Sequence, residues 1–155
     1  MNVAKKPARL RLDEFLPYRL SIASNAVSKA IAHAYDKRFG LSLPEWRIIA
    51  VLNEIDSGTQ QDLVGRTLMD KVAVSRAAQS LVKRGLVERR PHSGDGRAHR
   101  LTLSKTGAAL YGRIAPAALD YERRLLASFR KDQVAALNDM LALLANAASI
   151  LAEKA

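Results

Sequence analysis

Side chains that donate hydrogen bonds recur on one side of the segment between Asp70 and Gly85. Arginine, lysine, glutamine and serine at helical spacing can bond the base edges of a DNA major groove and the neighbouring phosphates. The outward set is Lys71, Val72, Ser75, Arg76, Gln79 and Lys83. A solvated amphipathic surface helix has the same pattern, so the surrounding sequence must decide between the two interpretations.

Apolar residues at helical spacing form the opposite side of this segment. They are Val74, Ala77, Ala78 and Leu81. Asp70 can cap the first turn with its carboxylate, and Gly85 can end the helix because glycine adopts the left-handed conformation at low cost. We therefore predict a helix between them, whose alanines allow close packing against a neighbouring helix.

The flanking segments predict a winged helix-turn-helix. Upstream, Thr59 and Asp62 have the spacing of a capping box before a short helix from Gln60 to Arg66. Downstream, 86–91 and 98–103 are strand-like and enclose a loop rich in turn formers. A short helix, a tight break, a basic helix and a hairpin in this order are typical of DNA-binding winged helices.

The predicted hairpin carries an arginine near its tip. Arg97 can enter a minor groove, where A·T-rich narrowing concentrates negative potential. Asp95, two residues earlier, can hold the guanidinium by a charge-assisted hydrogen bond. An ordinary solvated turn is the alternative interpretation.

The net charge of +10 is concentrated in two places. The segment 71–100 holds eight basic and two acidic residues, and residues 1–12 hold four basic residues and no acidic one. A localised basic surface indicates a polyanionic partner. We expect DNA rather than a membrane, because the side opposite the charges is mostly alanine, a poor membrane anchor.

Long apolar stripes predict helices at both ends of the chain. The first runs from Asp13 to Arg38, with regular helix beginning near 14–16 because Pro17 is tolerated only in the first turn. Another begins at Pro44 and ends at Ile55. After Ser104, a helix runs to about Phe129, and Pro116 is expected to kink or split it. The last, 131–152, carries a heptad-like seam of Val134, Leu137, Leu141, Leu144, Ala148 and Leu151.

These stripes predict a domain organisation and an assembly. We expect a flexible basic arm at 1–12, a helical dimerisation region at 13–40 and 104–152, and a DNA-binding lobe at 41–103. The end helices would pack on each other and on those of a second chain, which gives a two-fold homodimer. Such a dimer presents two recognition helices about one turn of DNA apart, roughly 34 Å.

Other classes of function find little support in the residues. The chain has no cysteine, and its three histidines are scattered without metal-ligand spacing, so we predict no catalytic residue, metal or cofactor. The basic N-terminus lacks the apolar core of a signal peptide. The longest run without charge, 140–152, is too short to cross a bilayer. We expect a cytoplasmic protein with no membrane partner.

Three motifs taken together resemble the MarR family of bacterial transcription regulators. They are DKVAVSR at 70–76, LVKRGLVER at 81–89, and Asp95-Gly-Arg97 followed by LTLSKTG at 101–107. The resemblance covers about residues 12–152. It implies a mainly α-helical fold with a small β-hairpin wing, in which the winged helix-turn-helix lies between N- and C-terminal dimerisation helices.

The resemblance also implies a function, that of a homodimeric regulator, usually a repressor, on a palindromic operator. At the family's positions, Val72, Ser75, Arg76 and Gln79 face the major groove. Arg97 reaches the minor groove, and Asp95 steadies it. The family branch that senses peroxides through a cysteine is excluded, since this chain has none. A ligand-independent architectural or protein-binding winged helix remains the alternative.

Many members of the family bind a small phenolic or aromatic carboxylate between the dimerisation helices and the DNA-binding lobe. We expect such a pocket to include Ser21, Asn25, Ser28, Trp46 and Arg47. Arg47 could pair with a carboxylate, and Trp46 could supply an aromatic wall. The alternatives are that Arg47 is a surface charge and that Trp46, the only tryptophan, belongs to the core.

Overall fold

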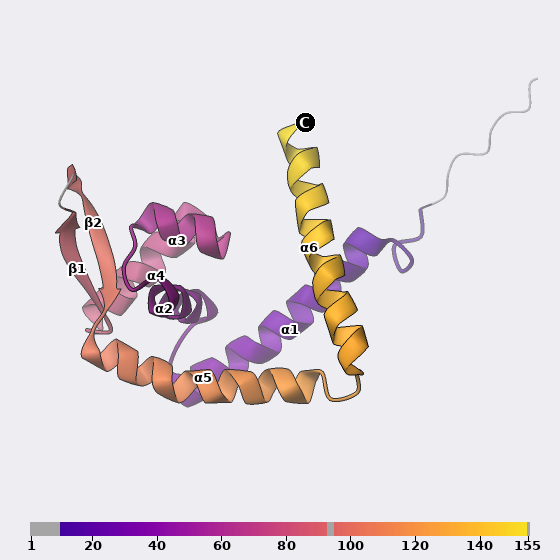
Figure 1. Ribbon diagram of the computed structural model, residues 1–155, viewed down its shortest axis with the longest axis horizontal. Coiled ribbons are helices and arrows are strands. Elements are labelled where there is room, and N and C mark those ends of the chain that lie inside the picture. Colours follow the sequence, from indigo (N-terminus) through magenta and orange to yellow (C-terminus); the bar gives the residue numbers. More distant parts are fainter. Residues whose placement is uncertain (1–9, 93–94, 155) are drawn as a thin grey trace, which may run out of the picture. The chain divides into compact units, whose positions relative to one another are not determined.

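The computed structural model describes residues 10–92 and 95–154, apart from the side chains at 92 and 95–98 (Figure 1). Within these residues the elements follow in the order α1 (Leu16–Phe39), α2 (Leu43–Ile55), α3 (Gln60–Thr67), α4 (Lys71–Lys83), β1 (Val87–His92), β2 (Asp95–Leu103), α5 (Lys105–Leu125) and α6 (Lys131–Glu153). The mainly helical fold with a two-stranded hairpin is the one that the sequence predicts. The chain forms two compact units, Met1–Gly112 and Arg113–Ala155.

Side-chain caps begin the helices of the helix-turn-helix. Thr59 and Asp62 form the predicted capping box, in which each side chain accepts from the other's backbone N–H. The Asp70 carboxylate accepts from the backbone N–H of Ala73 at 2.8 Å, which confirms the predicted start of α4. The starts of α3 and α4 are therefore both defined by local hydrogen bonds.

The core of the first unit lies where α2, α3 and α4 contact one another and the hairpin. The predicted inner face of α4 is buried, which confirms its helical periodicity. Ile48, Ile49 and Leu52 of α2 and Leu63 of α3 are buried with it. Each buried valine, leucine or isoleucine side chain stabilises the folded state by about 1.5–3 kcal/mol relative to an exposed one. These contacts therefore hold α4 firmly in the lobe.

The hairpin is joined to the loop between α2 and α3. β1 and β2 pair antiparallel, with Val87 opposite Leu103. The backbone of Leu101 exchanges two hydrogen bonds with Gly58, at 2.8 and 3.0 Å. The guanidinium of Arg100 donates to the Oγ of Ser57 at 2.7 Å and to its carbonyl at 2.8 Å. These contacts hold the base of the wing against the helix-turn-helix.

The prediction for α5 needs correction. The helix is not split at Pro116, and it ends at Leu125 instead of near Phe129. Proline lacks the N–H that would bond the carbonyl four residues earlier, and its ring crowds that carbonyl. We attribute the unbroken helix to the other backbone hydrogen bonds of α5, which outweigh the one that Pro116 removes.

The second unit exposes the apolar face of α6. None of the residues of this helix is buried, and Leu151 in the predicted seam is 70% exposed. By length and composition alone, α6 is also the one helix of the described residues that could cross a membrane. Its longest charge-free run, 140–152, is shorter than a transmembrane helix requires. The heptad-like spacing favours a partner helix as the cover for this face.

Candidate nucleic-acid interface

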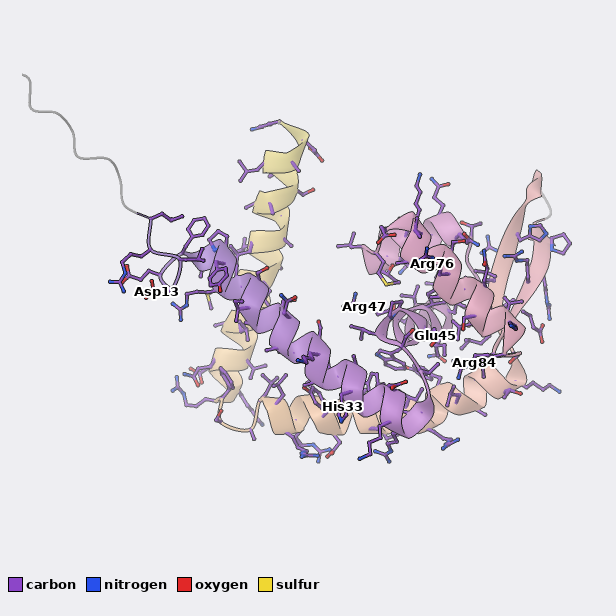
Figure 2. The ribbon with its side chains drawn as sticks, turned by 180° about the vertical axis from the view of Figure 1, so that it is seen from behind. Asp13, His33, Glu45, Arg47, Arg76 and Arg84 are labelled. Atoms are coloured by element: carbon purple, nitrogen blue, oxygen red, sulfur yellow. The ribbon has the colours of Figure 1, made fainter. Side chains whose placement is uncertain are left out.

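The outer face of α4 presents free hydrogen-bond donors to solvent. Arg76 points away from the body of the lobe (Figure 2). Gln79 is also exposed, Ser75 is half-buried, and Val72, one turn earlier, is 58% exposed. Gln79 donates from Nε2 to Ser75 Oγ at 3.2 Å. Lys71 and Lys83 are exposed at the two ends of the helix. Within the part of the chain that the structure describes, no carboxylate forms an ion pair with the basic side chains of this face.

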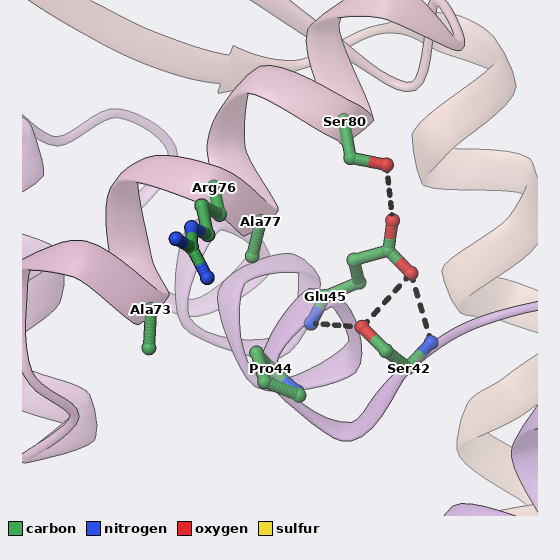
Figure 3. Close-up of a pocket in the computed structure, with 7 residues that line it drawn as sticks. All are labelled: Ser42, Pro44, Glu45, Ala73, Arg76, Ala77 and Ser80. Atoms are coloured by element: carbon green, nitrogen blue, oxygen red, sulfur yellow. Dashed lines mark hydrogen bonds between the residues drawn. The ribbon is translucent and has the colours of Figure 1, made fainter.

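A buried carboxylate fixes the opposite edge of α4. Glu45 of α2 is only 7% exposed, and Ser80 of α4 donates to its Oε1 at 2.6 Å. Arg84, which follows α4, donates to the same oxygen at 3.2 Å. The other oxygen, Oε2, accepts from the backbone N–H and the hydroxyl of Ser42 at 2.8 and 3.0 Å (Figure 3). One side chain therefore caps α2 and also binds the recognition helix.

This group of residues was not predicted from the sequence. Ser42 and Glu45 have the serine-to-glutamate spacing of a capping box, which the sequence alone could have revealed. The partners of Glu45 on α4 lie 35 and 39 positions away, at a separation for which local patterns give no signal. The contact of Arg100 with Ser57, 43 positions apart, was missed for the same reason.

We expect the Glu45 network to make folding sensitive to acid. Burial alone would raise the pKa of Glu45, but hydrogen bonds from Ser80 and Ser42 and the charge of Arg84 lower it below its ordinary value of 4.5. The stability that this carboxylate contributes is thus present above pH 4.5 and is lost as the pH falls through the lower pKa of the folded state. The Arg84 contribution is small, because its side chain is 37% exposed and screened by solvent.

The variant Glu45→Gln tests this expectation by chemical unfolding at several pH values. It should be less stable than the wild type by about 1–2 kcal/mol at pH 7, and the difference should shrink in acid. Glu54→Gln changes an exposed carboxylate on the same helix and is the control. A difference for Glu45→Gln that stays constant from pH 7 to pH 3 would contradict the assignment.

A hollow of about 360 Å³ lies between the start of α2 and the side of α4 (Figure 3). Pro44, Ala73 and Ala77 contribute to its wall, together with Arg76 and the residues of the Glu45 network. The small alanines that allow close packing of α4 on α2 also leave this space. The hollow thus adjoins the side chain that we expect to read the bases.

The structure places the five predicted ligand residues in different surroundings. Ser21, Asn25 and Arg47 are exposed, whereas Ser28 and Trp46 are half-buried. The ring of Trp46 stacks on Tyr111 of α5 at 6.0 Å and meets the edge of Tyr35 of α1 at 5.4 Å. These contacts make Trp46 part of an aromatic cluster where α1, α2 and α5 meet, and the hollow beside α4 is lined by none of the five residues.

The two wing residues are described only in part. The backbone of Asp95 and Arg97 belongs to β2, which begins three residues before the predicted strand 98–103, so these two residues are not in the loop as predicted. Their side chains lie outside the described residues. The contact of Arg97 with a minor groove and the supporting role of Asp95 therefore remain predictions.

Comparison with known proteins shows a similarity to one family. A model of the MarR family matches residues 39–98, which include α2, the helix-turn-helix and most of the wing. The chain is 29% identical over 105 residues to the homoprotocatechuate degradative operon repressor of Escherichia coli, across 68% of this chain and 71% of that protein.

Solved structures extend the similarity over nearly the whole chain. A MarR/EmrR family transcriptional regulator from Acinetobacter sp. ADP1 has a TM-score of 0.83 and 28% identity, over 90% of this chain and 99% of the other. A mutant MarR of E. coli in complex with operator DNA has a TM-score of 0.77 and 22% identity, over 88% and 99%, and shows the same fold. Over the helix-turn-helix and most of the wing this chain matches the MarR family, and its fold is that of solved winged-helix transcriptional regulators of that family.

Proposed function

We propose that this protein is a homodimeric repressor whose α4 reads an operator in the major groove. The observation that carries the proposal is the exposed polar face of α4, which is free of internal ion pairs in the described residues. The Glu45 network and the buried face of α4 hold that surface in one orientation. A rigid set of donors loses less side-chain entropy on binding, which favours specific contacts.

A second copy of the chain is the proposed cover for the apolar end helices. On α6 the seam residues Leu141, Leu144 and Leu151 are exposed, and on α1 Leu16 and Ile22 are each at least half exposed. Exposed apolar faces of this extent mark interaction surfaces in soluble proteins. A two-fold pair would use the same helices of both chains, which is the simplest closed assembly.

Competition binding separates this proposal from the architectural alternative. DNA enriched by the protein from a random pool is labelled and displaced with unrelated duplex at fixed salt. A regulator should prefer the enriched sequence by about 4–10 kcal/mol. A protein that binds only the phosphate backbone would show no preference and a steep loss of affinity with salt, and that result would contradict the proposal.

We further propose an aromatic carboxylate as the effector that releases the operator. The E. coli relative is named as the repressor of an operon for the degradation of homoprotocatechuate, an aromatic acid. In this chain, Arg47 supplies an exposed cation next to Trp46, whose ring already takes part in an aromatic cluster. A guanidinium binds a carboxylate by paired hydrogen bonds, and an aromatic ring can cover the face of the ligand.

Calorimetry with a panel of aromatic acids tests the role of Arg47. Arg47→Ala should weaken the binding of an active acid about tenfold, because one charge-assisted contact is lost. Arg89→Ala removes an exposed arginine from β1 and should leave the affinity unchanged. Equal affinity of the wild type and Arg47→Ala would remove Arg47 from the site.

A further inference from the structure

The turn between α3 and α4 carries a leucine in an unusual state. Leu68 has φ 53° and ψ 22°, in the left-handed region that non-glycine residues seldom adopt. Its side chain is 88% exposed, more than any other large apolar side chain of the described residues. Glycine or asparagine would fit this backbone better, and a polar residue would suit the exposure. A strained, solvent-facing leucine therefore points to a contact that the isolated chain does not show.

The turn holds this leucine in place. The backbone N–H of Leu68 donates to the carbonyl of Val64 at 3.0 Å. The hydroxyl of Thr67 donates to the carbonyl of Leu63 at 2.6 Å and accepts from the backbone N–H of Met69 at 3.4 Å. The Asp70 cap of α4 follows directly. The outward direction of the Leu68 side chain is thus set by hydrogen bonds on both sides.

The surroundings of Leu68 favour nucleic acid over protein as its partner. The nearby exposed side chains along the chain are the charged Arg66, Asp70 and Lys71, and Val72 is the one other large apolar side chain exposed there. A protein-docking patch would need several contiguous apolar residues. In helix-turn-helix proteins, residues at the N-terminal end of the recognition helix approach the base edges. The one apolar group on a base edge of the major groove is the thymine methyl.

We infer that Leu68 contacts a thymine methyl in each operator half-site and thereby adds to sequence specificity. The inference rests on the proposed DNA-binding function and deepens it. Leu68 precedes the N-cap of α4 by two residues, whereas Arg76 is the sixth residue of the helix, about one and a half turns from its start, so the two side chains would read different base pairs. The left-handed backbone of Leu68 directs its side chain toward the groove from the turn before α4, so no additional helical residue is needed for this contact.

Deoxyuridine substitution tests the contact directly, because it removes the methyl and keeps the base pairing. Each thymine of the enriched operator is replaced in turn, and affinity is measured for the wild type and for Leu68→Asn. Asparagine tolerates the left-handed conformation, so this variant should fold, and Leu68→Gly is a second variant with the same property. Thermal unfolding checks that both variants are as stable as the wild type.

For the wild type, we expect one thymine in each half-site at which loss of the methyl weakens binding about fourfold. Leu68→Asn should lose affinity for the thymine operator and show no further loss at that position, whereas Leu68→Met should keep the methyl dependence. Equal methyl effects in the wild type and Leu68→Asn would overturn the inference. A uniform loss on all DNA would place Leu68 against the sugars and would also overturn it. If the wild type enriches no sequence, the proposed function itself fails.

Discussion

Gly107→Ala is expected to destabilise the protein by about 3 kcal/mol, because no space exists for the added methyl. A Cβ at this position would overlap the backbone carbonyl oxygen of Leu86, which cannot move without shifting the start of the wing. The same region is already bonded tightly: Ser104 Oγ donates to the carbonyl of Gly85 at 2.7 Å and accepts from the N–H of Gly107 at 3.0 Å. Chemical unfolding of the two proteins measures the difference.

Gly112→Ala is the matched control for this prediction. It places a methyl in the same helix, where no atom lies within 4 Å of the new Cβ. Alanine is the better helix former, so this variant should be more stable than the wild type by about 0.5–1 kcal/mol. A change in the stability of both glycine variants in the same direction and by similar amounts would contradict the close contact between Gly107 of α5 and the carbonyl oxygen of Leu86.

Arg76→Ala should weaken specific DNA binding by about 1–3 kcal/mol for each half-site, the cost of a lost bidentate contact with a base. The side chain is exposed on the outer face of α4, so its removal should leave the fold intact. Binding to random DNA should change much less, because a nonspecific complex depends on phosphates. Fluorescence anisotropy with the enriched and random duplexes gives both affinities.

Lys83→Ala is the comparison for Arg76→Ala. Lys83 is exposed in the last turn of α4, and loss of a phosphate contact there would weaken binding to every sequence by a similar factor.

Arg97→Ala should weaken binding most at operators with an A·T-rich flank, since the narrow groove there attracts the guanidinium. In a DNA footprinting experiment, each variant should protect the operator less than the wild type does. If Arg76→Ala and Arg97→Ala both give the wild-type footprint, the proposed docking geometry is incorrect.

Local sequence patterns predicted most of the fold. The period of Val74, Ala77 and Leu81 predicted which side of α4 is buried, because a helix repeats every 3.6 residues whatever its partners are. Asp70 and Thr59 predicted helix starts, because capping acts between neighbours in sequence. Pro116 does not split α5, one of the two outcomes expected for it, since the cost of one missing hydrogen bond did not outweigh the remaining turns of the helix.

The parts of the site that escaped prediction depend on tertiary contacts. Ser80 and Arg84 look like ordinary members of an amphipathic helix until α2 brings Glu45 beside them. Leu68 looked like an unremarkable residue of a short break, since sequence gives neither its φ angle nor its exposure. The division into a DNA-binding lobe at 41–103 and dimerisation helices on either side also stays a prediction.

The most direct test of two-fold operator recognition is the symmetry of the DNA that the protein selects from a random pool. The selected sequences should share an inverted repeat, with half-site centres 10–10.5 base pairs apart or a multiple of that spacing. Two α4 helices related by a dimer axis would produce this pattern. A consensus that consists of one unrepeated half-site, or no consensus at all, would contradict the account.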